Sequence, residues 1–411
     1  MRHSSRAEVR LRSNRVNYST LLLIGAAILA TPAHAQRGPA PVAYAWANLA
    51  STASYTPNAS YAYNPSGGGI TITRNATGSY TVVFSGLGSL TDAMLGGLGN
   101  VQVSAYGTNS AICKPATWGA TTDYTVSVLC YNEDGLLSDN RFTIMVTLPG
   151  SNPVDLGFAF ANQETTASYT AVKSRAYHSE GRDVTITRSS TGNYQVRFVG
   201  MGAALTGSGA GEGGHIQVTA VGTDNGSCTV PGWSSPSGDL LVNVYCFTSA
   251  GTADARFSIL VLGKNSDVGG LGFAWANNST ASSYTPSTTY SYNMAGAAVT
   301  ATRTGTGQYA MQWSSLGTFS DAAPGGLGDV HVVPYNTKRQ AFCTVGGWSA
   351  ATGTASVSCF EGYGVSHNPL DTPFNVFMLF RQTTITDTGT IDFDAYADAQ
   401  VITGVTGEPV S

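Results

Sequence analysis

The sequence predicts an all-β protein of three tandem antiparallel β-sandwich domains, with one disulfide in each domain. Three observations predict it. A block of about 115 residues occurs three times, its short runs alternate apolar and polar residues between turn residues, and each block holds two cysteines. A length of 411 residues also favours several cores over one. A small β-barrel in each block is the alternative architecture.

The N-terminus has the pattern of a secretory signal peptide. Five arginines precede the apolar run of residues 21–30, and Ala33-His34-Ala35 is a small-x-small cleavage site. The alternative is an uncleaved anchor, but the run is about half of the roughly 20 residues that a membrane span needs. We therefore expect export and cleavage after Ala35.

The remaining chain is weakly and negatively charged. Residues 36–411 contain 15 basic and 23 acidic residues, a net charge of −8, and only 11% of the whole chain is charged. This balance argues against a nucleic acid or an anionic lipid surface as partner. It is typical of a β-rich extracellular protein.

Each repeat opens with an Ala-aromatic-Ala-Asn motif, at residues 45–48, 159–162 and 274–277, separated by 114 and 115 residues. A Ser-Tyr-Thr motif follows at the same intervals. The spacing predicts a signal peptide at 1–35, repeats at 36–150, 151–265 and 266–383, and an acidic tail at 384–411.

The next block predicts a β-hairpin in every repeat. Residues 70–74 read Ile-Thr-Ile-Thr-Arg, a turn ends in Gly78, and residues 80–84 read Tyr-Thr-Val-Val-Phe. Repeats two and three carry the same pattern at 184–198 and 299–313. Since alternate side chains of a strand share a face, Tyr80, Val82 and Phe84 should point into the core.

Further alternating strands follow around residues 101–103, 216–218 and 330–332, and a closing strand lies around Phe142, Phe257 or Phe374. Between them lie the cysteines. An even number per repeat in an exported protein predicts one bridge within each repeat, whereas two thiols without neighbouring His or Cys ligands make a poor zinc site. The cysteines, repeat by repeat, are Cys113 and Cys130, Cys228 and Cys246, and Cys343 and Cys359.

The linkers around 150–153 and 263–270 are short, so we expect the domains to stack as a rod with limited hinge freedom. The tail after Arg381 carries five acidic residues and no basic one. It is either a disordered segment or, because residues 395–398 echo the opening motif, a strand that packs on the third domain.

An arginine and an aspartate recur in every repeat, which invites an ion pair in each. We interpret them as structural pairs joining two strands, with a ligand-binding pair as the alternative. The expected pairs are Arg74 with Asp139, Arg188 with Asp254, and Arg303 with Asp371.

Trp118, Trp233 and Trp348 each follow the first cysteine of a repeat by five residues. Packing beside the disulfide is the favoured interpretation. Exposed rings could instead form a platform on which sugars stack.

No repeated catalytic set is present. The histidines after the signal peptide, at 178, 215, 331 and 367, do not recur at one aligned position, and no Gly-x-Ser-x-Gly motif occurs. Residues 132–135 are the best calcium candidate, but the other repeats lack them, and an ordinary turn is the simpler interpretation. We expect no enzyme activity, no cofactor and no metal site.

The string Thr-Arg-x-x-Thr-Gly-x-Tyr, the Gly-rich loop before Val-x-Val, and the Cys, Trp, Cys order resemble a repeat of uncharacterised secreted bacterial proteins. The resemblance covers residues 41 to about 382. It implies a tandem disulfide-bonded β-sandwich and no assigned activity.

These features predict a secreted or surface-associated binding or structural protein that could bind an extracellular glycan or a cell-surface protein through three weak sites acting together. One alternative is an exported hydrolase or hydrolase accessory, which would need a His, acid and hydroxyl cluster in one repeat only. Another is a structural spacer, which would have no exposed aromatic strip.

Overall fold

The computed structural model describes residues 40–91, 96–150, 155–205, 209–321, 324–335, 341–362 and 368–381. The predicted signal peptide and acidic tail lie outside these ranges. The described residues are strands, turns and short 3-10 helices without an α-helix, and they belong to one compact unit. In the described part of the chain, no helix has the length and apolar character needed to span a membrane.

For description we name three segments: segment 1 (residues 40–150), segment 2 (155–265) and segment 3 (266–381). The strands of segment 1 are β1 (Val42–Ala47), β2 (Ser54–Tyr55), β3 (Ala62–Tyr63), β4 (Ile70–Ala76), β5 (Ser79–Phe84), β6 (Asn100–Tyr106), β7 (Ile112–Ala120), β8 (Tyr124–Tyr131) and β9 (Arg141–Thr147).

Segment 2 contains β10 (Leu156–Ala161), β11 (Ser168–Thr170), β12 (Ala176–His178), β13 (Val184–Ser190), β14 (Asn193–Phe198), β15 (His215–Val221), β16 (Ser227–Ser234), β17 (Leu240–Thr248), β18 (Gly251–Thr252) and β19 (Arg256–Leu262). Segment 3 contains β20 (Gly270–Ala276), β21 (Ser283–Tyr284), β22 (Ser291–Asn293), β23 (Val299–Gly305), β24 (Gln308–Trp313), β25 (Asp329–Pro334), β26 (Ala341–Ser349), β27 (Thr354–Glu361) and β28 (Phe374–Phe380).

Within the described ranges, eight 3-10 helices connect strands. They are η1 (Ala59–Tyr61), η2 (Leu87–Leu90), η3 (Lys173–Arg175), η4 (Met201–Leu205), η5 (Pro236–Gly238), η6 (Thr288–Tyr290), η7 (Leu316–Phe319) and η8 (Ala350–Thr352).

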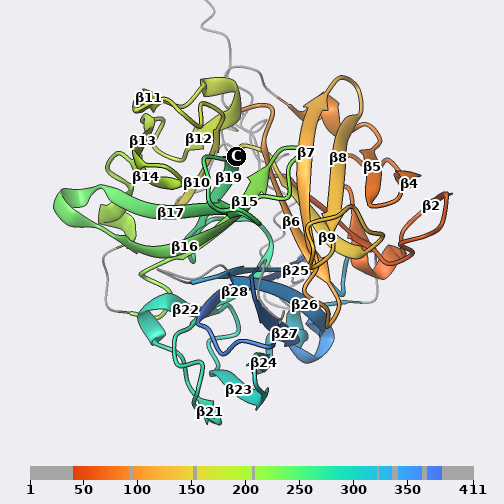
Figure 1. The fold of residues 1–411 in the computed structure, drawn as a ribbon. Coiled ribbons are helices and arrows are strands. Elements are labelled where there is room, and N and C mark those ends of the chain that lie inside the picture. Colours follow the sequence, from red (N-terminus) through yellow and green to blue (C-terminus); the bar gives the residue numbers. More distant parts are fainter. Residues whose placement is uncertain are drawn as a thin grey trace, which may run out of the picture. The chain divides into compact units, whose positions relative to one another are not determined.

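The described strands form five sheets (Figure 1), and one strand order occurs in every segment. Five strands pair as β2-β4-β5-β8-β7 in segment 1, and their counterparts pair in the same order in segments 2 and 3. Four others pair as β3-β1-β9-β6, again with counterparts in the same order. A parallel bridge between Val345 and Tyr106 joins β26 to β6, so one sheet of nine strands runs from segment 3 into segment 1.

The predicted hairpin is confirmed as β4 and β5, and it recurs as β13 with β14 and β23 with β24. Tyr80, Val82 and Phe84 share the buried face, as the alternation predicts. The turn glycine has a left-handed backbone in all three hairpins, with φ of +64° at Gly78, +68° at Gly192 and +63° at Gly307. A β-bulge precedes each of these turns and ends the regular pairing.

Each segment has an apolar core of its own, and all three contribute to a fourth. Tyr44, Phe158, Phe273 and Phe377 are fully buried members of this shared core. It packs on strands such as β9, β19 and β28, in which nearly every residue is buried. These strands are therefore covered on both faces, by the core of their segment and by the shared core.

Contacts between segments close into a ring, so the expected linear rod is wrong. The N–H groups of Gly96 and Gly211 donate to the next segment, at Lys173 and Thr288. The N–H of Gly325 donates to Ala59, which returns from segment 3 to segment 1. In a rod the first and third domains would not touch.

Candidate functional site

The three predicted disulfides are present, and each joins residues directly opposite on neighbouring strands. The chain-entropy model gives about 3 kcal/mol for a closed loop of this length. The bridges are Cys113–Cys130, Cys228–Cys246 and Cys343–Cys359.

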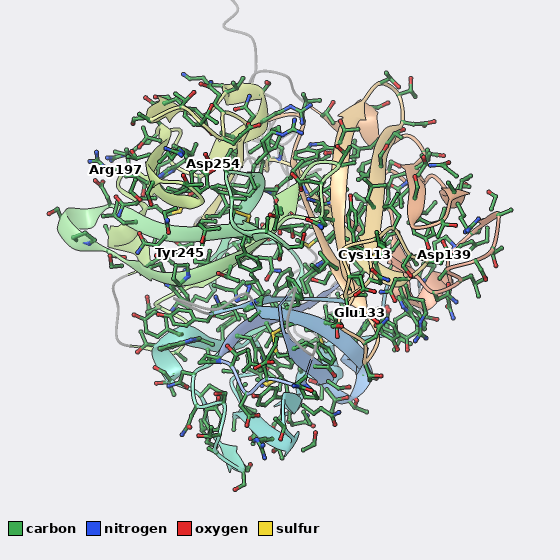
Figure 2. The ribbon with its side chains drawn as sticks, viewed as in Figure 1. Cys113, Glu133, Asp139, Arg197, Tyr245 and Asp254 are labelled. Atoms are coloured by element: carbon green, nitrogen blue, oxygen red, sulfur yellow. A yellow bond between two sulfur atoms is a disulfide. The ribbon has the colours of Figure 1, made fainter. Side chains whose placement is uncertain are left out.

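The recurring arginine and aspartate lie together in all three segments; Figure 2 labels two of the aspartates, Asp139 and Asp254. The Arg74 Nη2 to Asp139 Oδ2 distance is 2.8 Å, and the Arg188–Asp254 and Arg303–Asp371 pairs measure 2.8 and 2.9 Å. Asp139 also accepts from the N–H of Gly78 and the hydroxyl of Tyr80.

Each of these aspartates therefore ties the hairpin turn to the start of the closing strand. The hydrogen bond from Arg74 holds the pKa of Asp139 below its usual range, and the N–H of Gly78 acts in the same direction. Three donors from the hairpin, Arg74, Gly78 and Tyr80, occupy the Asp139 carboxylate, which favours a structural role.

The three repeated tryptophans lie between segments. Trp118 of segment 1 packs on Phe160 of segment 2, with the Arg175 guanidinium 5.0 Å from the Trp118 ring centroid. Trp233 packs on Trp275, Tyr290 and Tyr335 of segment 3. Trp348 closes the ring on Trp46, Tyr61 and Tyr106 of segment 1.

Their indole N–H groups are also occupied, by the backbone carbonyls of Leu98, Gly213, Leu327 and Gly328. In the described part of the chain, every Trp, Tyr and Phe is buried or partly buried, and none is in the exposed class. A structural spacer is expected to show this pattern, because it would have no exposed aromatic strip. The pattern also argues against sugar stacking on the tryptophans.

A column of polar side chains lies where β6, β15 and β25 contact one another. Each strand contributes alternate residues, which makes three layers of three. We name this set the polar column, in which Val333 is the one apolar member: Asn100, His215 and Asp329; Gln102, Gln217 and His331; Ser104, Thr219 and Val333. All nine are buried.

Hydrogen bonds across the column link the segments. Asn100 Nδ2 donates to the Ser258 hydroxyl at 2.7 Å, and the Thr219 hydroxyl donates to Gln102 Oε1 at 2.7 Å. Buried polar groups cost free energy unless they are paired, so these bonds also fix the register between segments.

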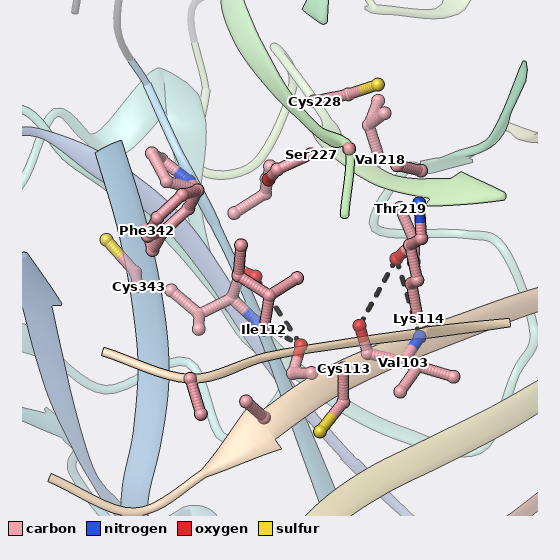
Figure 3. A pocket seen from close by; sticks show the side chains of 18 residues that line it. Val103, Ile112, Cys113, Lys114, Val218, Thr219, Ser227, Cys228, Phe342 and Cys343 are labelled. Atoms are coloured by element: carbon pink, nitrogen blue, oxygen red, sulfur yellow. Dashed lines mark hydrogen bonds between the residues drawn. The ribbon is translucent and has the colours of Figure 1, made fainter. Parts of the chain in front are cut away.

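One end of the column opens into a cavity of about 50 Å³ (Figure 3). Cys113, Cys228 and Cys343 approach it from three different segments, and Ser104 and Thr219 also line it. A volume of this size accommodates roughly three to five water molecules, well below the usual drug-sized pocket. We name it the central cavity.

Lys114 also lines the central cavity, with its side chain only 1% exposed. Its Nζ lies 2.5 Å from Asp224 Oδ1 of segment 2. Burial lowers the pKa of Lys114, and the contact with Asp224 opposes that shift. This pair links segments 1 and 2 at the cavity wall.

Ser104, His331 and Asp329 form a hydrogen-bonded chain between segments 1 and 3. Ser104 Oγ lies 3.2 Å from His331 Nδ1, and His331 Nε2 lies 2.8 Å from Asp329 Oδ2. Burial raises the pKa of the Asp329 carboxyl, and the adjacent His331 opposes that shift. The chain is a His, acid and hydroxyl cluster, but it spans two segments.

Sequence reasoning did not single out Ser104 or Asp329, and it treated His331 as one histidine among four. A signal was available, because a polar residue recurs between two apolar β-branched residues at 101–103, 216–218 and 330–332. In an isolated sheet such residues face water; here the next segment covers them.

The calcium candidate at 132–135 forms a turn, in which Asn132 Oδ1 accepts from the N–H groups of Asp134 and Leu136. Within the described ranges, no three His, Cys, Asp or Glu side chains are grouped so that they could hold a metal ion.

Comparison of the chain with known protein families, with curated proteins and with solved structures found no match.

Proposed function

We propose that this is an exported binding and structural protein, in which three β-sandwich repeats form one closed body and present three similar faces to a neutral, hydroxyl-rich partner such as an uncharged polysaccharide. Three disulfides accord with an oxidising compartment. The observation that carries the choice of partner is the outer face of the five strands β2-β4-β5-β8-β7 and of their counterparts in the other segments.

In segment 1 this face carries a row of hydroxyl side chains that crosses all five strands. Strand pairing places them next to one another in the order Ser54, Thr73, Thr81, Ser127 and Thr117. All five are exposed or partly exposed. Neighbouring strands lie about 4.8 Å apart, so the row offers evenly spaced donors and acceptors.

The equivalent rows of the other segments are also uncharged. Segment 2 has Ser168, Thr187, Gln195, Asn243 and Gly232. Segment 3 has Ser283, Thr302, Ala310, Ser356 and Gly347.

A charged ligand would find no complementary charge on these rows, whereas sugar hydroxyls could exchange hydrogen bonds with them. Each row alone would bind weakly, because its groups are already solvated by water. Three rows on one body could raise the apparent affinity about 10²- to 10⁴-fold when the partner is a long polymer.

The test is retention of the protein from residue 36 onward on insoluble neutral and acidic polysaccharides. We expect retention on neutral polymers, and loss of most of it when Thr81 and Ser127 are both changed to Lys. Ser51→Lys, on an exposed loop, is the matched control for added charge. Equal retention of both variants, or none on any neutral polymer, would contradict the proposal.

A further inference from the structure

The polar column is not the same at its three interfaces. At the position of His331 the other segments have Gln102 and Gln217, and at the position of Asp329 they have Asn100 and His215. Within the polar column, the side chains that hydrogen-bond between segments 1 and 2 are uncharged: Asn100, Gln102 and Thr219. A fully buried carboxylate is far more expensive to desolvate than an amide, so holding the segments together does not explain Asp329.

The hydrogen bonds order these three side chains as an acid, a base and a nucleophile. When the Nε2–H of His331 donates to Asp329 Oδ2, the lone pair of Nδ1 faces the Ser104 hydroxyl, which can donate to it at 3.2 Å or to the Val332 carbonyl at 3.4 Å. A hydroxyl beside a base that a third group orients is the general signature of an activated nucleophile.

Ser104 is also the member of this chain that lines the central cavity. The N–H of Val332 donates to Ser104 Oγ at 3.2 Å. When the hydroxyl turns into the cavity, this N–H loses its acceptor and becomes available to a negatively charged oxygen nearby. The cavity has room only for a short acyl group.

We propose that Ser104 accepts short acyl groups from esters at the central cavity, with His331 as general base and Asp329 as the residue that positions His331. The Ser104 oxygen attacks the ester carbonyl carbon while its proton passes to His331 Nδ1. The bond to the alcohol then breaks, and His331 returns the proton to the departing oxygen. Water attacks the acyl-serine in the same way and releases the carboxylic acid.

Two small probes test the proposal on the full protein from residue 36. Methanesulfonyl fluoride should give a single adduct that peptide mapping places on Ser104, and 4-nitrophenyl acetate should be hydrolysed faster than the octanoate. Ser104→Ala should abolish the adduct and lower acetate hydrolysis at least 100-fold. Ser227→Ala is the control, because Ser227 also lines the cavity.

His331→Gln introduces the residue found at the equivalent positions and should prevent labelling while the protein stays folded. Asp329→Asn should keep some labelling but shift its pH dependence, which a purely structural role would not do. An unlabelled Ser104 in the folded protein, or equal hydrolysis by Ser104→Ala, would overturn the proposal. Retention on polysaccharide does not involve Ser104, so the two proposals can fail separately.

Discussion

At the residue scale, one carboxylate serves several donors in each segment. Asp371 accepts from Arg303, from the N–H of Gly307 and from the hydroxyl of Tyr309. Neither the arginine nor the aspartate is more than about a third exposed. The same arrangement in three segments ties a hairpin turn to a closing strand, and its hydrogen bonds can be tested without disturbing the apolar core.

We expect Asp371→Asn to destabilise the protein by about 1 to 3 kcal/mol near neutral pH, because a charged acceptor is lost from several donors. The pKa of Asp371 is lowered, first by Arg303. Its contribution is therefore present above the usual pKa of an aspartate and is lost as the pH falls through the lower folded value. Urea unfolding at neutral and acidic pH measures this.

The control is Asp134→Asn, on an exposed turn. A loss for Asp371→Asn that matched the control at neutral pH, or that grew towards acid, would contradict this account.

At the scale of elements, two turn glycines distinguish the cost of backbone strain from the cost of a steric clash when a side chain is added. A Cβ at Gly192 would lie 2.4 Å from the Cys246 carbonyl oxygen, whereas nothing lies within 4 Å of a Cβ at Gly181. Both glycines have positive φ, of +68° and +70°. Gly181→Ala should cost about 1 to 2 kcal/mol through backbone strain alone, and Gly192→Ala clearly more. Thermal unfolding of both variants checks this, and equal losses would refute it.

Individual strands and hairpins could be predicted from the sequence, whereas their arrangement between segments could not. The hairpin over 70–84 was predictable because alternation with period two and a turn glycine are local signals. The ring was not, because the contacts of Gln102 and His331 lie with another segment. A signal for two-sided burial was nevertheless present in closing strands such as Phe374–Phe380, whose residues are nearly all apolar.

At the scale of the whole molecule, the ring places titratable groups where water cannot reach them. His215 is 1% exposed and lies between Phe273 and Phe377. Burial lowers the pKa of His215 to about 3, with a smaller effect in the same direction from His331. The folded state thus binds fewer protons than the unfolded state at mildly acidic pH.

Stability from neutral His215 is therefore complete above its unfolded pKa of about 6.5 and falls as the pH drops towards 3, by at most about 5 kcal/mol. His215→Gln should remove this slope. Burial raises the pKa of Asp329, so Asp329 changes the free energy of unfolding with pH in the opposite direction. This effect is present in both the unmodified protein and His215→Gln. The difference between their free energies of unfolding, measured in urea at each pH, therefore isolates His215. Parallel curves between pH 4 and 7 would show that His215 is not buried as described.

The closure of the ring can be tested at the interface between segments 3 and 1, because these two segments are not consecutive in the chain. Trp348 packs there on three aromatic residues, while Trp118 occupies the equivalent place between segments 1 and 2.

Trp348→Ala should open the contact locally. The amides of Gly325 and Leu327 donate to Ala59 and Ser60 across this interface, so they should exchange hydrogen faster in the variant. The amides of Gly96 and Leu98 should keep their protection in this variant and lose it in Trp118→Ala. If each substitution instead affected all four amides equally, the ring would open as a single unit and not one interface at a time.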